Sequence, residues 1–118
     1  MGLDTSHNCW HGPYSSFMRW RMAVCKAAGL GDLLQYEGFG LSKTKQFDAS
    51  DPLTILLWHS DCDGEIAYTD CTALARRLEE ILPKLDPSGE SGRTVEHTRQ
   101  FIAGLLTAAK AKENVDFR

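Results

Sequence analysis

The chain has 118 residues, of which 42% are hydrophobic and 25% charged, and its formal net charge is -3 at pH 7. This length and composition suit a single core, so we expect residues 1–118 to fold as one domain. The basic residues are spread along the chain, which argues against a nucleic-acid partner, and the longest apolar run, residues 53–58, is too short to span a membrane.

The four cysteines are Cys9, Cys25, Cys62 and Cys71. No apolar signal-peptide core precedes them, and the first dozen residues are polar and rich in histidine. We therefore expect a cytoplasmic protein with reduced thiols. Cys25 and Cys71 are expected to be buried without a chemical role.

The first predicted helix covers residues 13–28. Its apolar residues recur at steps of three and four, a proline stands in its first turn, and Gly29 follows its last residue. Arg19, Arg21 and Lys26 are expected on the opposite, solvent-facing side, with an arginine near the helix start available to a pocket. Residues 30–49 are glycine-rich and indicate a loop with a short helical turn at residues 32–36.

Residues 53–58 follow the dipeptide Asp51-Pro52, which is typical of a helix start. A short helix is the main interpretation, and a buried strand is the alternative, because periodicity does not separate the two over so few residues. A regular apolar stripe over residues 74–85 then predicts a helix that Pro83 ends or bends.

A last helix is predicted over residues 94–112, after the turn-forming segment at residues 86–92. Gly104 on this helix indicates a close approach to a neighbouring segment. His97 is expected at its surface. Residues 114–118 alternate in polarity and predict a short strand that pairs with residues 1–4.

The resulting fold class is mainly α, with α+β as an alternative. We expect a small domain of three to four helices, with an acidic turn between two helices and a short terminal β pair. No internal repeat is visible in the sequence.

Residues 59–70 match a twelve-residue EF-hand loop at several positions, with Asp61, Asp63 and Asp70 as candidate ligands of calcium. The first position is His59 instead of an aspartate, and the last is an aspartate instead of a glutamate, so the match is incomplete. The alternative is a helix-connecting turn in which the aspartates cap backbone amides and Gly64 takes a positive φ.

A second polar cluster, residues 7–11, contains His7, Cys9 and His11 in alternation. An extended segment would place these three on one side, and zinc would suit such ligands if Cys62 and His59 completed the set. The cluster lacks the paired spacings of common zinc sites. A divalent cation, zinc or calcium, is thus a candidate cofactor.

A pocket that needs no metal is the third interpretation of these clusters. Aromatic walls with a few convergent polar groups are typical of small-molecule sites, and arginine with histidine suits a phosphate-bearing nucleotide or a similar anion. The candidate ligand-binding residues are His7, His11, Tyr14, Arg19, Trp20 and His59.

Three segments of the sequence are distinctive: MGLDTSHNCWHGPYSSFMRWR, DPLTILLWHSDCDGEI and CTALARRLEEILP. Through them the chain resembles, over most of its length, a family of short uncharacterised bacterial and phage proteins. The resemblance implies that both polar clusters belong to one functional unit. It also implies a phage accessory role such as sequestering a host signalling molecule.

The expected function is therefore binding of a small polar or nucleotide-type ligand in a pocket built from residues 7–11 and 59–65. The sequence contains no GxSxG or HExxH motif, which favours binding over catalysis. The alternatives are a metal-dependent hydrolase that uses the same clusters and a structural or partner-binding module. A homo-oligomer is compatible with each of these interpretations.

Overall fold

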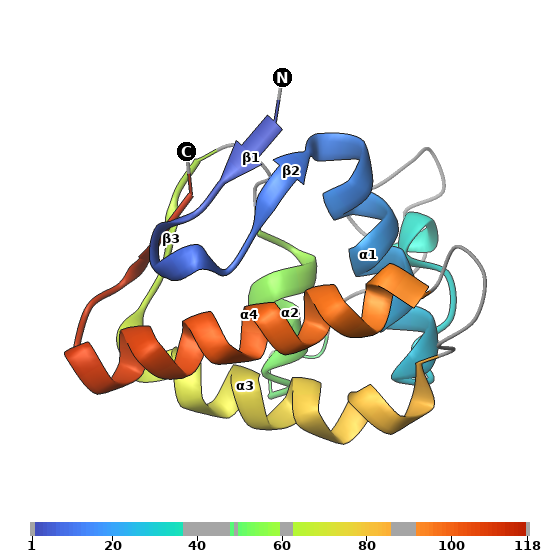
Figure 1. Cartoon of the computed structure of the whole chain (residues 1–118). Helices are drawn as coiled ribbons and strands as arrows, with labels where there is room; N and C mark the ends of the chain where they lie inside the picture. Colours follow the sequence, from blue (N-terminus) through green and yellow to red (C-terminus); the bar gives the residue numbers. More distant parts are fainter. Residues whose placement is uncertain (1, 37–47, 49, 60–62, 86–91, 118) are drawn as a thin grey trace.

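The computed structural model describes residues 2–36, 48, 50–59, 63–85 and 92–117, and within them the protein is mainly helical, as the sequence predicts (Figure 1). The α-helices are α1 (Tyr14–Ala27), α2 (Leu53–Leu57), α3 (Tyr68–Ile81) and α4 (Gly92–Ala111). Short 3-10 turns occur at η1 (Ser6–Asn8), η2 (Leu33–Gln35) and η3 (Leu82–Lys84). The strands are β1 (Gly2–Asp4), β2 (His11–Pro13), β3 (Glu65–Ile66) and β4 (Val115–Asp116).

The boundaries of the helices confirm the predictions that rest on local signals. Helix α1 starts directly after Pro13 and ends before the positive-φ Gly29, which has a φ of 80°. The predicted helical turn after residue 32 is η2. Residues 53–57 form a helix rather than a strand, and α3 ends at Ile81, two residues before Pro83.

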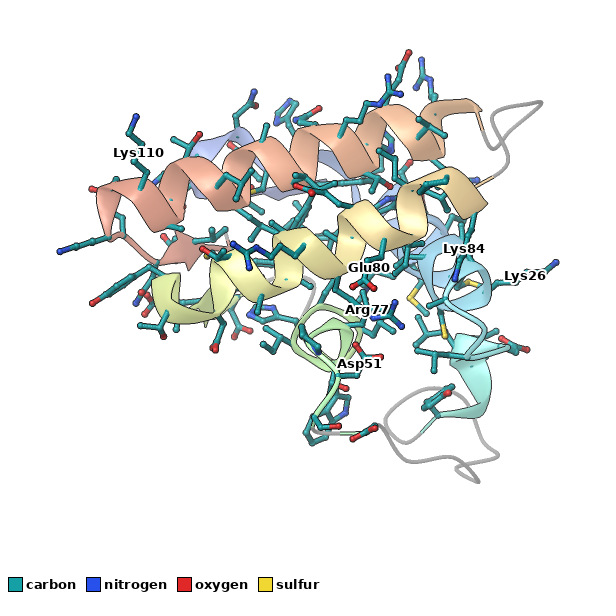
Figure 2. All side chains as sticks on the ribbon, turned by 90° about the horizontal axis from the view of Figure 1, so that it is seen from below. Lys26, Asp51, Arg77, Glu80, Lys84 and Lys110 are labelled. Atoms are coloured by element: carbon teal, nitrogen blue, oxygen red, sulfur yellow. The ribbon has the colours of Figure 1, made fainter. Side chains whose placement is uncertain are left out.

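Asp51 fixes the start of α2. Its Oδ1 accepts a hydrogen bond from the backbone N–H of Leu53 at 3.0 Å, as expected for a helix cap. The same carboxylate pairs with Arg77 of α3, at 3.1 Å from Nε, and Figure 2 shows the two side chains directed toward each other. The cap and the ion pair together join α2 to α3.

Helices α3 and α4 lie side by side and antiparallel, with α3 at the bottom of the view of Figure 1. The buried residues of α3 recur at helical spacing, so that they form one apolar stripe facing the core: Cys71, Leu74, Ala75, Leu78 and Ile81. On α4, Phe101, Ile102, Leu105 and Ala108 are buried in the same way, whereas Leu106 is 41% exposed.

The strands pair differently from the prediction. Strand β1 pairs antiparallel with β2, and β4 pairs antiparallel with β3. The prediction that residues 1–4 pair with residues 114–118 is therefore wrong in its partners, although an isolated bridge between Thr5 and Phe117 brings the two ends of the chain together. A local β1–β2 hairpin needs only a short connection, which is why it takes precedence over the distant pairing.

One continuous hydrophobic cluster joins residues from all four helices and both strand pairs. Arg21 lies within it at 3% exposure, so the prediction of a solvent-facing Arg21 is wrong. Its Nη1 donates to the carbonyl oxygens of residues at the end of α2, the shortest bond being 2.7 Å to His59. These carbonyls need a donor inside the core, and the long arginine side chain supplies it.

Among the described residues, no helix has both the length and the apolar character needed to cross a membrane.

Candidate functional site

The turn between β1 and β2 carries the first polar cluster, and it is not extended. His7 and Asn8 have left-handed backbone conformations, with φ of 59° and 56°. Cys9 and Trp10 are buried, whereas His11 faces solvent. The prediction that His7, Cys9 and His11 share one face is therefore wrong, because the left-handed residues reverse the chain between them.

This backbone is costly for His7 because a left-handed conformation destabilises a residue other than glycine by roughly 1–2 kcal/mol. Several contacts hold the turn in place. The carbonyl of Asn8 accepts a 3.0 Å hydrogen bond from Gln100 of α4, and the N–H of Trp10 donates to Thr5 Oγ1 at 2.9 Å. The surrounding structure thus stabilises a conformation that the segment alone would not favour.

The His7 side chain lies between two partners. Its Nδ1 is 2.8 Å from Ser6 Oγ, and its Nε2 is 2.9 Å from Glu113 Oε1. Ser6 Oγ also accepts a 2.8 Å hydrogen bond from the backbone N–H of Asp116 in β4. The His7 side chain is 14% exposed and that of Glu113 63% exposed, so the chain of hydrogen bonds ends at the protein surface.

Cys9 is packed against α4 at Gly104. A Cβ added to Gly104 would overlap the Cys9 sulfur and would lie 2.9 Å from both the Cys9 Cα and the His7 carbonyl oxygen. The predicted close approach at Gly104 is therefore confirmed. Burial raises the pKa of the Cys9 thiol from 9.0 to about 12, and the hydrogen bond with Thr5 only partly offsets this effect. A neutral, buried thiol behaves as a small apolar group.

Trp10 is the centre of an aromatic cluster formed with Phe17 and Trp20, at ring-centroid distances of 5.1 and 5.3 Å. Its indole N–H is buried and has no hydrogen-bond partner among the described residues. The ring of His97 packs against Trp10 at 4.4 Å and is only partly exposed, so the prediction that His97 lies at the surface holds in part. Burial and the positive charge of Arg93 lower the pKa of His97.

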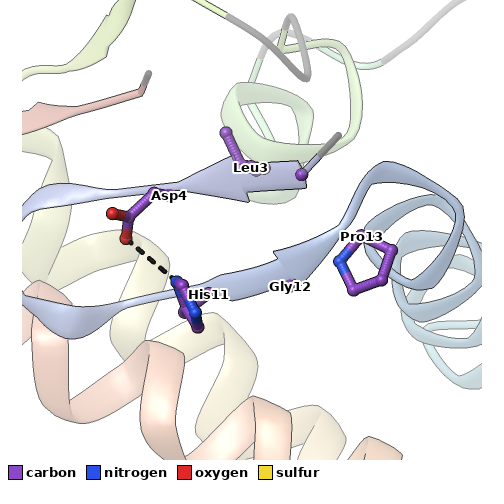
Figure 3. Close-up of a pocket in the computed structure, with 6 residues that line it drawn as sticks. Leu3, Asp4, His11, Gly12 and Pro13 are labelled. Atoms are coloured by element: carbon purple, nitrogen blue, oxygen red, sulfur yellow. Dashed lines mark ion pairs between the residues drawn. The ribbon is translucent and has the colours of Figure 1, made fainter.

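The β1–β2 hairpin contains a shallow hollow, and Figure 3 shows the residues that line it: Gly2, Leu3, Asp4, His11, Gly12 and Pro13. Asp4 Oδ1 and His11 Nδ1 are 3.5 Å apart, and both side chains are mostly exposed. A Cβ added to Gly12 would meet one atom within 4 Å, Trp10 Nε1 at 3.7 Å. The unpartnered indole N–H thus lies behind Gly12, on the side to which a Cβ would point, and Trp10 itself is not among the residues that line the hollow.

The predicted ligand-binding residues on α1 separate into two groups. Tyr14 is the first residue of α1 and directly follows Pro13 of the hollow, whereas Arg19 lies in the second turn of α1 and donates to Ser16 Oγ at 3.3 Å. Trp20, in contrast, is 2% exposed, and its Nε1 donates to Thr98 Oγ1 at 2.9 Å. Trp20 is therefore a core residue and not the wall of an open pocket.

The second polar cluster is described in part, because Asp61 and Cys62 lie outside the described residues. His59 Nε2 is hydrogen-bonded to the Glu65 carbonyl at 3.0 Å, and its ring packs against Phe117 at 4.0 Å. Gly64 has a φ of 90°, which confirms its predicted conformation. Asp63 and Asp70 are both exposed, and Asp70 lies in the first turn of α3.

The C-terminal residues connect the two clusters. The N–H of Asp116 donates to Ser6 Oγ at 2.8 Å, and the N–H of Phe117 donates to the Gly64 carbonyl at 2.9 Å. His7 and His59 therefore contact the same short segment, His7 through Glu113 and His59 through Phe117. Among the described residues, the two clusters are thus connected through residues 113–117.

Within the described parts of the chain, no three His, Cys, Asp or Glu side chains are grouped in a way that suits a metal ion. Of the predicted metal ligands, Cys9, Asp63 and Asp70 are described and lie in different surroundings. The predictions of zinc and calcium depend on Asp61 and Cys62 as well, so they stay predictions.

Sequence reasoning did not identify Ser6, Glu113 or Asp116 as part of the His7 environment. Glu113 is 106 residues from His7, and Asp116 is 110 residues from Ser6. A single sequence contains no signal for contacts of this range. The one local signal was the adjacency of Ser6 to His7.

No protein-family model, curated protein or solved structure matches this chain. The resemblance to short bacterial and phage proteins therefore stays an expectation from the sequence.

Proposed function

We propose that the protein binds a small polar ligand with an anionic group, of the nucleotide type, in the hairpin hollow and at the adjoining start of α1. The observation that carries the proposal is the buried, unpartnered N–H of Trp10 behind Gly12. Leaving such a donor unsatisfied costs about 1–3 kcal/mol. A ligand oxygen that entered the space beside Gly12, where an added Cβ would lie 3.7 Å from Trp10 Nε1, would compensate that cost.

The start of α1 supplies an environment for the anionic group. No side chain caps the helix, and its first turn contains no acidic residue. The N-terminal end of a helix carries a partial positive charge and directs N–H groups outward, which favours phosphate or carboxylate. Arg19, held near the first turn by Ser16, adds a formal positive charge.

Asp4 and His11 supply further polar groups that would contact the ligand. Their exposed side chains stand 3.5 Å apart beside the hollow, within reach of a ligand. The carboxylate accepts hydrogen bonds from hydroxyl or amino groups, and the imidazole binds an anionic oxygen. A phosphorylated molecule that also carries hydroxyl or amino groups, such as a nucleotide, satisfies both.

Calorimetry with inorganic phosphate, adenosine, AMP and ATP tests the proposal. We expect the nucleotides to bind more tightly than phosphate or adenosine alone. Arg19→Gln and His11→Ala should each weaken nucleotide binding about tenfold, the equivalent of roughly 1.4 kcal/mol. Arg76→Gln, at an exposed arginine of α3, is the matched control and should leave the affinity unchanged.

Heat denaturation of the complex should release the nucleotide unchanged. Failure of all four compounds to bind at concentrations up to about 1 mM would contradict the proposal. Equal weakening by Arg19→Gln and Arg76→Gln would also contradict it, because it would indicate a non-specific charge effect.

A further inference from the structure

The side chains of Ser6, His7 and Glu113 form a continuous chain of hydrogen bonds. The Ser6 Oγ to His7 Nδ1 distance is 2.8 Å, and the His7 Nε2 to Glu113 Oε1 distance is 2.9 Å. With its proton on Nε2, the imidazole donates to the carboxylate and accepts from the serine hydroxyl. A nucleophile bonded to a base that a third group orients is the arrangement of serine-dependent acyl transfer.

Two further features of the same residues suit this chemistry. The N–H of Asp116 donates to Ser6 Oγ at 2.8 Å, and a hydroxyl that accepts this bond can direct its own proton toward His7. The backbone of His7 is left-handed, with φ 59° and ψ 17°. Strained backbone of this kind is concentrated at functional sites, where the surrounding structure holds it.

We propose that Ser6 is a nucleophile for ester hydrolysis, with His7 as its general base and Glu113 as the positioning residue. Ser6 Oγ attacks the ester carbonyl carbon, and its proton passes to His7 Nδ1. The bond to the leaving alkoxide breaks as His7 returns that proton to it. Water then attacks the acyl–serine carbonyl while His7 takes its proton, and His7 returns this proton to Ser6 Oγ as the acyl–serine bond breaks, which releases a carboxylic acid and free Ser6.

This site is separate from the proposed ligand site in the residues that it uses. Ser6, His7 and Glu113 belong to the turn η1 and to the segment between α4 and β4. The proposed ligand site uses Asp4, His11 and the start of α1. The two proposals can therefore be tested independently.

Covalent labelling with a fluorophosphonate tests the serine directly. The full chain is incubated with the probe, and the modified residue is located by peptide mass mapping. His7→Asn removes the base while keeping the backbone accessible, since asparagine tolerates a left-handed conformation. Glu113→Gln removes the charge of the positioning residue, and Ser15→Ala, at an exposed serine of α1, is the matched control for Ser6→Ala.

We expect one adduct, on Ser6, that is absent from Ser6→Ala and unchanged in Ser15→Ala. The labelling rate should fall at least about 100-fold in His7→Asn and about tenfold in Glu113→Gln. Hydrolysis of p-nitrophenyl acetate should fall in the same order. Circular dichroism shows which variants keep the fold, and the comparison with His7→Asn stands even if Ser6→Ala unfolds.

Three results would overturn the proposal: no adduct at all, an adduct on other serines at a comparable rate, or equal labelling rates in the wild type and folded His7→Asn. Any of these would mean that the hydrogen bonds of Ser6 and His7 only stabilise the turn.

Discussion

Replacing Gly104 with alanine places a Cβ where α4 touches the N-terminal turn. The added atom would overlap the Cys9 sulfur and lie 2.9 Å from the Cys9 Cα and from the His7 carbonyl oxygen. Two of these three atoms belong to the backbone, so a change of side-chain rotamer cannot relieve the contact. The turn at residues 7–9 has to move away from α4.

The size of the effect follows from two opposing terms. Overpacking of a tight interior site costs about 1–3 kcal/mol, and the backbone contacts here place Gly104→Ala at the upper end of that range. Replacing glycine with alanine inside a helix gains about 1 kcal/mol. We therefore expect a net loss of about 2 kcal/mol in the free energy of unfolding, or roughly 8 °C in Tm for a chain of this length.

Urea denaturation followed by circular dichroism measures this loss. Thr107→Ala, on the exposed side of α4, is the control and should change the free energy of unfolding by less than about 0.5 kcal/mol. Adding Cys9→Ala to Gly104→Ala should not restore the wild-type stability, because the backbone contacts remain. A Gly104→Ala protein as stable as the wild type would refute the close contact between α4 and the turn.

Three further predictions concern the stability of the fold. Asp51→Ala should lower the free energy of unfolding by about 2 kcal/mol, because it removes both the cap of α2 and the ion pair with Arg77. Asp51→Asn keeps the cap and should lower the free energy of unfolding by less than about 1 kcal/mol. Urea titrations that give equal losses for the two variants would contradict the capping role. The unfolded chain releases the Cys9 proton near pH 9, while the folded chain holds it to about pH 12. The free energy of unfolding should therefore fall as the pH rises across this interval, and it should fall less steeply in Cys9→Ala. Because the pKa of His97 is lowered from 6.5 in the folded state, the unfolded chain binds a proton at this residue first on acidification. The urea midpoint of the wild type should therefore fall as the pH drops below 6.5, and that of His97→Gln should fall less. Identical pH profiles of the two proteins would exclude His97 as the cause.

The helices could be predicted from the sequence because their signals are local. The apolar spacing of α3, the Asp51-Pro52 start of α2 and Pro83 after α3 each act within one or two turns. Gly104 was also informative, since a glycine inside an apolar helix stripe indicates close packing. Local signals thus gave the start of α2 and the end of α3, whereas α3 begins at Tyr68, six residues before the predicted stripe.

Arg21 shows where helix periodicity alone fails. Its position suggested a solvent-facing side chain, but the carbonyl groups at the end of α2 need donors within the core. The need arises on another element, 35–38 residues further along the chain. Helical spacing on α1 contains no information about it.

The candidate site was predicted only in part for the same reason. Of the predicted ligand-binding residues, His11 lines the hollow and Tyr14 begins α1, whereas Trp20 belongs to the core. The partners of His7 were not predictable, because Glu113 reaches it only after the whole chain has folded back. The sequence also contains no signal for the left-handed backbone conformation of His7 and Asn8.

The position of β4 between the two clusters has a consequence for the order of folding. The contacts of Ser6 with Asp116 and of His7 with Glu113 close loops of more than 100 residues. During synthesis, the N-terminal turn cannot form these hydrogen bonds until nearly all of the 118 residues have been made. Long-range contacts of this kind form slowly. We therefore expect the hydrogen bonds of Ser6 and His7 to form last, after the α3–α4 pair has packed.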